Sequence, residues 1–180
     1  TTADDKVGLY TARGVLLFPC EYADIKGVEM PEYGEEILFE LSQNNTVGLY
    51  NNAGVAIIPI GKYDAYVYRP PFFQVEQKGL WGVCSDKGEE LVPCKYKSIA
   101  ATTKLFVVAS ADSKQGLVDY NGQELFPFVS STIVDVLPDY IKVSDGGGKF
   151  GALNYQGQVI VPVKNQPENV AKKVQAYANK

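Results

Sequence analysis

The chain has 180 residues, of which 46% are apolar and 21% charged, so it can bury a core and is not expected to be disordered. Its 17 basic and 21 acidic residues give a net charge of -4, and the lysines and arginines are spread thinly, which argues against a nucleic-acid partner. Histidine is absent, which removes the Ser-His-Asp and Cys-His catalytic arrangements and histidine-based metal motifs; we expect no enzymatic activity, no cofactor and no metal site.

The N-terminal residues 1–5 are small and polar and lack the basic and apolar regions of a signal peptide. We therefore expect that such a peptide is either absent or already removed. No apolar run approaches the roughly 18 residues that a membrane-crossing helix requires. The sequence therefore predicts a chain that does not span a membrane.

A frame of two glycines and a proline, G-x5-G-x4-P, recurs along the chain. By composition a given glycine would have the other two partners by chance in about 0.5% of cases, so the recurrence indicates an internal repeat. The frame stands at Gly8, Gly14 and Pro19; Gly48, Gly54 and Pro59; Gly82, Gly88 and Pro93; Gly116, Gly122 and Pro127; and Gly151, Gly157 and Pro162.

Each unit is predicted to hold up to four short strands. We expect one strand after the first glycine, a hairpin turn at the second, and a strand that ends at the proline, which cannot donate a backbone hydrogen bond. Asn121 and Gly122 predict the tightest turn, with both residues at positive φ. The expected ranges are 15–18, 55–58, 91–92, 125–126 and 159–161 for the strands before proline, and 37–41, 72–75, 105–109 and 140–143 for the last strands.

The frame predicts a single all-β repeat domain over residues 1–180. Its units span approximately 6–45, 46–79, 80–113, 114–148 and 149–180, with an insertion in the first unit near residues 26–36. No unit can bury both faces alone, so neighbouring units must complete the core. Five compact units favour a small five-bladed β-propeller. The alternative is an open β-solenoid or twisted repeat sheet.

The last residues, 166–180, fit two structures. Apolar residues at helical spacing after Pro167 would form a helix. The repeat instead predicts that residues 173–179 form the missing last strand, and we favour the strand.

The pair Trp81-Gly82 opens the third unit, and its equivalents are Val7-Gly8, Val47-Gly48, Gln115-Gly116 and Phe150-Gly151. With its hairpin and its apolar run into proline, this pattern resembles the bacterial WG-repeat family. The resemblance implies an all-β binding or scaffold module, often in envelope or secreted proteins, without shared catalytic residues. We accordingly expect a location outside the cytoplasm, in the periplasm, at the cell surface or in the medium.

The remaining chemistry-bearing residues fit structural roles. We expect Cys20, Cys84 and Cys94 to be buried free thiols, because their positions in the frame do not favour a disulfide. The acidic pairs at 35–36 and 89–90 fit solvated turns better than the active site of a small hydrolase.

Aromatic residues around a Pro-Pro turn are the strongest candidates for a binding site. Aromatic side chains on loops anchor proteins and stack on sugars. The alternative is that they cover the ends of the sheets. We expect alanine at Phe72 and Phe73 to abolish binding without unfolding the protein. The candidate binding residues are Tyr33, Tyr66, Tyr68, Arg69, Phe72 and Phe73.

The sequence therefore predicts a non-enzymatic repeat module that binds another protein, as an accessory part of a bacterial envelope or surface assembly. The alternative is a carbohydrate-binding, lectin-like domain, which would present similar pockets on several units. The loops of the units differ in length and composition, which disfavours equivalent pockets.

Overall fold

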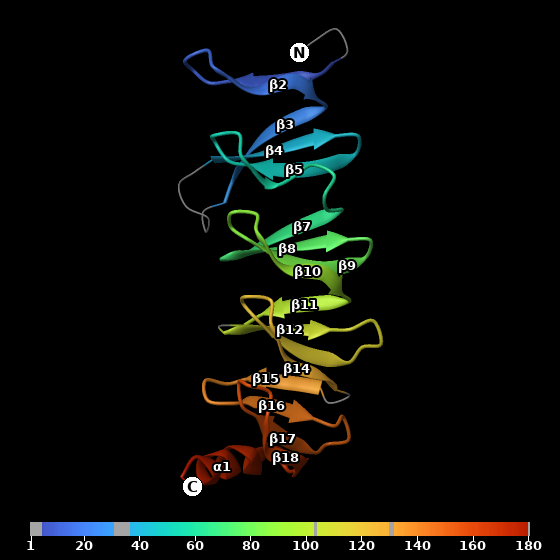
Figure 1. Cartoon of the computed structure of the whole chain (residues 1–180), viewed down its shortest axis with the longest axis vertical. Coiled ribbons are helices and arrows are strands. Elements are labelled where there is room, and N and C mark those ends of the chain that lie inside the picture. Colours follow the sequence, from blue (N-terminus) through green and yellow to red (C-terminus); the bar gives the residue numbers. More distant parts are fainter. Residues whose placement is uncertain (1–4, 31–36, 103, 130–131, 180) are drawn as a thin grey trace. The chain divides into compact units, whose positions relative to one another are not determined.

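The computed structural model describes residues 5–30, 37–102, 104–129 and 132–179 and shows an all-β repeat fold with a C-terminal helix (Figure 1). The chain divides into two compact units, Thr1–Cys94 and Lys95–Lys180, and the boundary falls inside β10. The prediction of tandem β-repeats is confirmed.

The first unit holds a two-stranded sheet and two four-stranded sheets, in which neighbours along the chain pair with each other. The two-stranded sheet contains β1 (Val7–Tyr10) and β2 (Leu16–Tyr22). The second contains β3 (Asp24–Glu29), β4 (Ile37–Gln43), β5 (Thr46–Tyr50) and β6 (Ala56–Ile58). The third contains β7 (Ala65–Arg69), β8 (Phe72–Gln77), β9 (Leu80–Ser85) and β10 (Glu90–Tyr96).

The second unit holds two further four-stranded sheets and the helix. One sheet contains β11 (Ser98–Ala101), β12 (Leu105–Ala109), β13 (Gln115–Asp119) and β14 (Glu124–Val129). The other contains β15 (Thr132–Val136), β16 (Ile141–Ser144), β17 (Phe150–Leu153) and β18 (Val159–Asn165), and α1 (Pro167–Ala178) follows.

The sheets are half a unit out of step with the sequence frame. In the last four frames the first glycine lies in the third strand of a four-stranded sheet, and the proline lies in or beside the fourth. Each of the first four sequence units therefore supplies two strands of one sheet and the first two strands of the next, and the fifth supplies the last two strands of its sheet and α1. Among the described residues the sheet of the first frame consists of β1 and β2.

Close packing of backbone explains the first glycine of the frame. A Cβ atom on Gly82 would lie 2.5 Å from the carbonyl oxygen of Val92 and 2.8 Å from the amide nitrogen of Cys94, on either side of Pro93. No side chain fits at such distances, because backbone atoms cannot move away cheaply. The same two backbone groups, one before and one after the proline, approach Gly8, Gly48 and Gly151.

The strand that carries the proline approaches the glycine because it is bulged. In the first sheet Val7 faces Tyr22 and Leu9 faces Phe18, so three residues, Pro19 among them, lie opposite Gly8. Equivalent register shifts occur between β13 and β14 and between β17 and β18. A bulge locally disrupts the ladder, which suits a residue without an N–H.

The turn at the second glycine differs from the predicted one. Gly122 has φ of +83°, but Asn121 is not at positive φ, so the two-residue turn expected there is wrong. Instead the Asp119 carboxylate accepts hydrogen bonds from the amides of Asn121 and Gln123, at 2.9 and 2.8 Å. Asn51, Ser85 and Asn154 make the same pair of bonds in their turns.

Turns with two residues at positive φ occur instead in the preceding hairpin, between the second and third strands of two sheets. Asn44 and Asn45 join β4 to β5 with φ of +52° and +62°. Lys78 and Gly79 join β8 to β9 with φ of +54° and +78°. Such turns follow the right-handed twist of the strands they connect.

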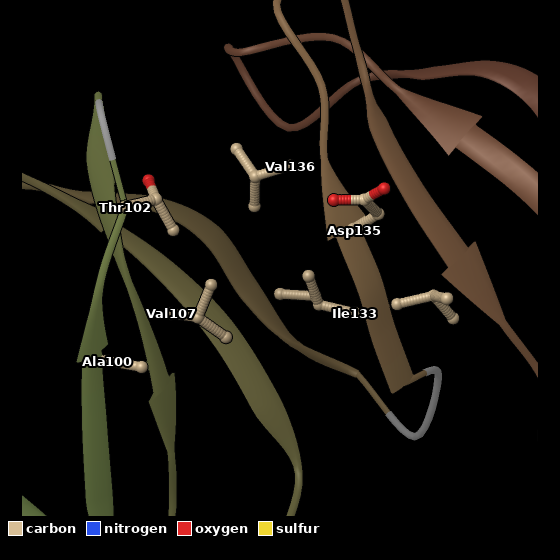
Figure 2. Close-up of a pocket in the computed structure, with 7 residues that line it drawn as sticks. Ala100, Thr102, Val107, Ile133, Asp135 and Val136 are labelled. Carbon is tan, nitrogen blue, oxygen red and sulfur yellow. The ribbon is translucent and has the colours of Figure 1, made fainter.

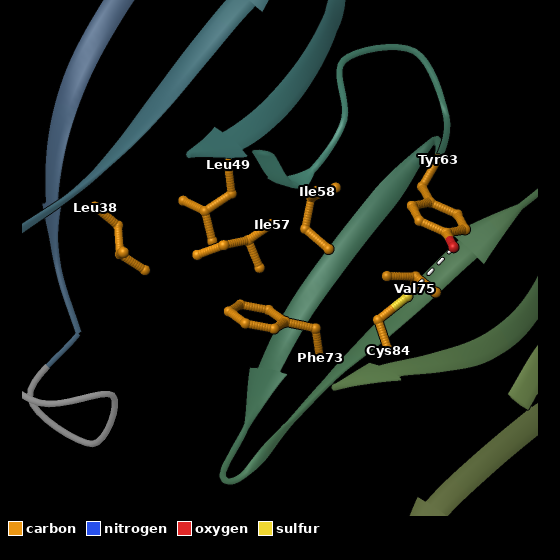
Figure 3. Packing of buried hydrophobic residues seen from close by; sticks show 8 residues of the cluster. All are labelled: Leu38, Leu49, Ile57, Ile58, Tyr63, Phe73, Val75 and Cys84. Carbon is orange, nitrogen blue, oxygen red and sulfur yellow. Dashed lines mark hydrogen bonds between the residues drawn. The ribbon is translucent and has the colours of Figure 1, made fainter. Parts of the chain in front are cut away.

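Two buried clusters hold neighbouring sheets together. In the first unit side chains of β4, β5 and β6 pack against side chains of β8 and β9 (Figure 3). In the second unit Leu105 and Leu117 pack against Ile141, Val143 and Leu153. Each sheet thus buries a face against its neighbour within the unit, as the repeat predicted.

The C-terminal segment is a helix, so the predicted strand at 173–179 is wrong. Val170 and Val174 lie one helical turn apart and are buried against Ala152 and Val161 of the last sheet. Pro167 stands at the start of the helix, where its missing N–H is not needed. Among the described residues no ladder joins β1 or β2 to the last sheet, so strand pairing does not close the array. This is consistent with the open alternative.

We expect Gly82→Ala to lower the free energy of unfolding by about 1–3 kcal/mol, because its Cβ would overlap backbone atoms of β10. The matched control is Gly27→Ala, since a Cβ there meets only the Ile37 side chain at 3.6 Å. The control should change stability by no more than about 0.5 kcal/mol. Urea denaturation measures both, and equal effects would contradict the packing argument.

Candidate functional site

The predicted aromatic site lies on the β7–β8 hairpin and is largely part of the core. Phe73 is fully buried and Phe72 is 8% exposed. The Phe73 ring lies 4.7 Å from the Tyr68 ring and 6.2 Å from the Tyr66 ring, between centroids. Phe73 belongs to the buried cluster between the second and third sheets (Figure 3), and Tyr66 and Tyr68 pack against that cluster. Phe72 and Phe73 lie in β8, in agreement with the strand predicted at 72–75, and their burial leaves little side-chain surface for a ligand.

Tyr66 and Arg69, the remaining predicted residues considered next, differ in their surroundings. The Tyr66 hydroxyl donates a hydrogen bond to the Glu40 carboxylate at 2.6 Å, and burial raises the pKa of Tyr66 above its usual range. Arg69 is exposed at the end of β7. Tyr33 lies outside the described residues. A binding role for these residues stays a prediction.

We expect Phe73→Ala to lower the free energy of unfolding by about 3–5 kcal/mol, because it removes a fully buried ring. Arg69→Ala, a change at an exposed neighbour, should stay within about 0.5 kcal/mol of wild type. Chemical denaturation compares the two variants. A loss below about 1 kcal/mol for Phe73→Ala would show that the ring does not support the core.

The three cysteines are free, but their environments differ. Cys20 is exposed, which corrects the expectation of burial, whereas Cys84 is buried and Cys94 half-buried. Burial raises the pKa of Cys94 to about 11 and also raises the pKa of Cys84, whose sulfur lies 3.2 Å from the Tyr63 hydroxyl. Both groups therefore remain thiols at neutral pH, and thiols are poor nucleophiles.

We expect Ellman's reagent at pH 8 to modify one thiol per native chain rapidly and all three after denaturation. The rapid phase belongs to Cys20, and Cys20→Ser should remove it. Because the pKa of Cys94 is raised to about 11, its thiolate fraction, and with it the rate of the slow reaction, increases only as the pH approaches about 11. Two rapid native thiols would contradict the burial of this pair.

A pocket of about 450 Å³ lies in the second unit (Figure 2). Val107 of β12 and Ile133 and Val136 of β15 point into the space between these strands (Figure 2). Ala100 and Thr102 complete one side, and Val134 and Asp135 complete the other. The amide of Ile133 donates to the Gln115 side-chain oxygen at 2.6 Å, which ties β15 to the neighbouring sheet.

A bulge in β15 shapes this pocket. Ile133 faces Val143 and Asp135 faces Lys142, so Val134 is an extra residue in the strand. Val134 is 48% exposed although it is a large apolar residue. Bulges of this kind often redirect side chains next to binding sites. The sequence analysis missed the pocket, because its residues have the composition of ordinary strands.

The lining of the pocket is mainly aliphatic. Of its seven lining residues only Thr102 and Asp135 carry polar side chains, and none is aromatic. A second pocket of about 250 Å³, between β18 and α1, has a different lining: Ile160, Val161, Pro162, Lys173, Ala176 and Tyr177. These two pockets are therefore not repeated copies of one site.

The described residues contain no group of three or more Cys, Asp or Glu side chains placed to hold a metal ion. They also contain no helix with the length and apolar character needed to cross a membrane.

Comparison with known proteins identifies part of the repeat. Residues 81–103, which begin at the Trp81-Gly82 pair, match the family model described as "WG containing repeat". The chain carries a WG-containing repeat. The WG-repeat prediction is thus confirmed on this segment, and the other units share its glycine and proline frame.

Several solved structures are similar at low sequence identity. The computationally designed Ika4 protein aligns at 13% identity over 65% of this chain and 84% of its own, with a TM-score of 0.37. BamB from Moraxella catarrhalis aligns at 14% identity over 73% of this chain and 47% of its own, with a TM-score of 0.39. The WD40 β-propeller domain of Doa1 aligns at 12% identity over 91% of this chain and 63% of its own, with a TM-score of 0.34. This chain thus spans about half the length of BamB. No curated protein matches the sequence.

Proposed function

We propose that this chain is a non-enzymatic module that binds another protein, as an accessory component of a bacterial envelope or surface assembly outside the cytoplasm. The pocket between β12 and β15 is the observation that carries the proposal. A WG-containing repeat and a β-repeat fold are consistent with an interaction scaffold. The envelope location follows from the resemblance to bacterial WG-repeat proteins.

The chemistry of the pocket favours an apolar protein side chain as its ligand. A volume of about 450 Å³ has room for one or two such side chains, and the aliphatic walls formed by Val107, Ile133 and Val136 would bury them. Protein interfaces place their binding energy in a few apolar anchors of this kind. The exposed Val134 extends the apolar surface at the rim.

The glycan alternative has less support from the geometry. Sugars bind by stacking on aromatic faces and by several directed hydrogen bonds. The pocket beside β15 has no aromatic wall and two polar side chains, Thr102 and Asp135. We therefore retain a glycan only as an outcome of the experiment.

The test compares two variants with similarly exposed valines in affinity capture from envelope and cytoplasmic extracts. Val134→Glu places a charge at the rim of the pocket and should weaken binding of the captured partner at least tenfold, as measured by calorimetry. Val55→Glu, at an exposed position that lines neither pocket, should bind like wild type.

Equal binding of both variants would contradict the assignment of the pocket. Recovery of the partner from the cytoplasmic extract alone would contradict the envelope location. A chain that captures no protein but binds on a glycan array would favour the lectin alternative.

A further inference from the structure

The pocket between β12 and β15 has an equivalent location in the first unit, between β4 and β7. The buried clusters of the two units are built from the same positions of the repeat, counted along each ladder from the first glycine of the sheet. The corresponding buried residues are Leu38 and Leu105, Leu49 and Leu117, Phe73 and Ile141, Val75 and Val143, and Cys84 and Leu153. The contents of the equivalent location in the first unit therefore indicate what the pocket accepts.

Two tyrosine rings occupy that location in the first unit. Tyr66 and Tyr68 of β7 pair with Val75 and Phe73 of β8. Both tyrosines pack against the buried cluster, and the Tyr66 hydroxyl donates to the Glu40 carboxylate of β4 at 2.6 Å. The rings thus fill the space between the first strand of one sheet and the second strand of the sheet before it.

Smaller side chains stand at the two tyrosine positions in the second unit. Ile133 takes the place of Tyr66 and Val136 that of Tyr68, because they face the equivalent residues of the neighbouring strand. Both line the pocket and point into the space between β12 and β15 (Figure 2). Because its lining residues all fall within 100–136, the pocket belongs to the interior of the repeat array and to neither end of the chain.

The residue that replaces Glu40 determines which aromatic ring fits. Val107 takes its place, because each of the two pairs with the residue after the first glycine. On the other side of the pocket the Thr102 hydroxyl already donates to the Leu105 carbonyl and accepts from the Leu105 amide, at 2.8 and 3.2 Å. A hydroxyl placed like that of Tyr66 would lose its acceptor, and burying it unpaired costs free energy. A ring without a hydroxyl has no such cost.

Asp135 does not replace Glu40 as an acceptor inside the pocket. It stands at the register position of Val67, and it is exposed. Glu40 is half-buried and holds the Tyr66 hydroxyl against the cluster. We therefore expect the Asp135 carboxylate to keep its hydration at the rim.

We propose that the pocket binds a phenylalanine side chain of the partner protein, which takes the place of the tyrosine rings of the first unit. The ring lies against Val107, Ile133 and Val136. An aliphatic cavity of about 150 Å³ already binds benzene, so a pocket of about 450 Å³ has room for the ring. The inference rests on the proposed protein-binding function and names the residue that the partner contributes.

The probes are N-acetyl-phenylalaninamide, N-acetyl-tyrosinamide and N-acetyl-leucinamide, each titrated into the full chain. NMR follows the methyl signals of Val107, Ile133 and Val136. The phenylalanine probe should move them upfield, because groups above the face of an aromatic ring are shielded. The tyrosine probe should bind about tenfold more weakly, since its hydroxyl is buried unpaired, and the leucine probe about threefold more weakly, since it buries less apolar area. The methyl signals of Leu38 and Leu49, in the filled cluster, should not move.

A specificity change tests the pocket from the side of the protein. Val107→Glu restores the carboxylate that accepts the Tyr66 hydroxyl in the first unit, so this variant should bind the tyrosine probe more tightly than the phenylalanine probe. Val55→Glu, at an exposed position that lines neither pocket, should keep the preference for phenylalanine. Circular dichroism of both variants checks that each remains folded.

A second variant fills the pocket from within. Ile133→Tyr combined with Val136→Tyr recreates the rings of the first unit, so it should abolish binding of the phenylalanine probe and weaken binding of the captured partner about tenfold. Val55→Tyr, which adds a ring outside the pocket, should leave both unchanged.

Three outcomes would overturn the proposal: unmoved methyl signals, equal binding of the phenylalanine and leucine probes, or equal weakening of both aromatic probes by Val107→Glu. The proposed function survives these outcomes if Val134→Glu still weakens binding of the captured partner. Binding of the phenylalanine probe in the pocket without any captured protein rejects the proposed function instead.

Discussion

The contact between the first glycine of each frame and the bulged strand opposite it is the constraint on which the repeat depends. The carbonyl before the proline and the amide after it lie within 2.9 Å of where a Cβ would stand at Gly8, Gly48, Gly82 and Gly151. The proline and the glycine thus depend on each other, because the bulge that accommodates the proline requires a glycine on the opposite strand. The residue before the first glycine varies instead, since Val, Gln or Phe stands in the other four units where the third has Trp81.

The position of this contact within the sheet determines how the repeat units are divided among the sheets. Because the glycine lies in the third strand of a four-stranded sheet, one repeat unit contributes strands to two neighbouring sheets. The last sheet is complete, and the segment after it is free to form α1 and cover it. A bulge at Val134 opens the pocket in the second unit. The candidate pocket therefore arises where the regular pairing of the repeat is interrupted.

Much of the fold follows from the sequence, because the frame marks the strands directly. The range predicted at 105–109 coincides with β12, and the type of the repeat is confirmed. The offset of the sheets could not be predicted, since a period does not specify which strands share a sheet. The strand predicted at 72–75 agrees with β8, but a strand range alone does not show that the adjacent Phe72 and Phe73 are both buried. Side chains that accept hydrogen bonds from turn amides recur at the start of these turns, and their role was not predicted from the sequence. They belong to Thr11, Asn51, Ser85, Asp119 and Asn154.

The most direct test of the central contact is a set of proton NOEs in the full chain. An α-proton of each first glycine should show a strong NOE to the amide proton of the residue after the proline. The expected pairs are Gly8 with Cys20, Gly48 with Ile60, Gly82 with Cys94 and Gly151 with Val163. The account predicts all four cross-peaks. Their absence, with NOEs of an unbulged ladder in their place, would show that the glycine is not held against the proline strand and would contradict the account.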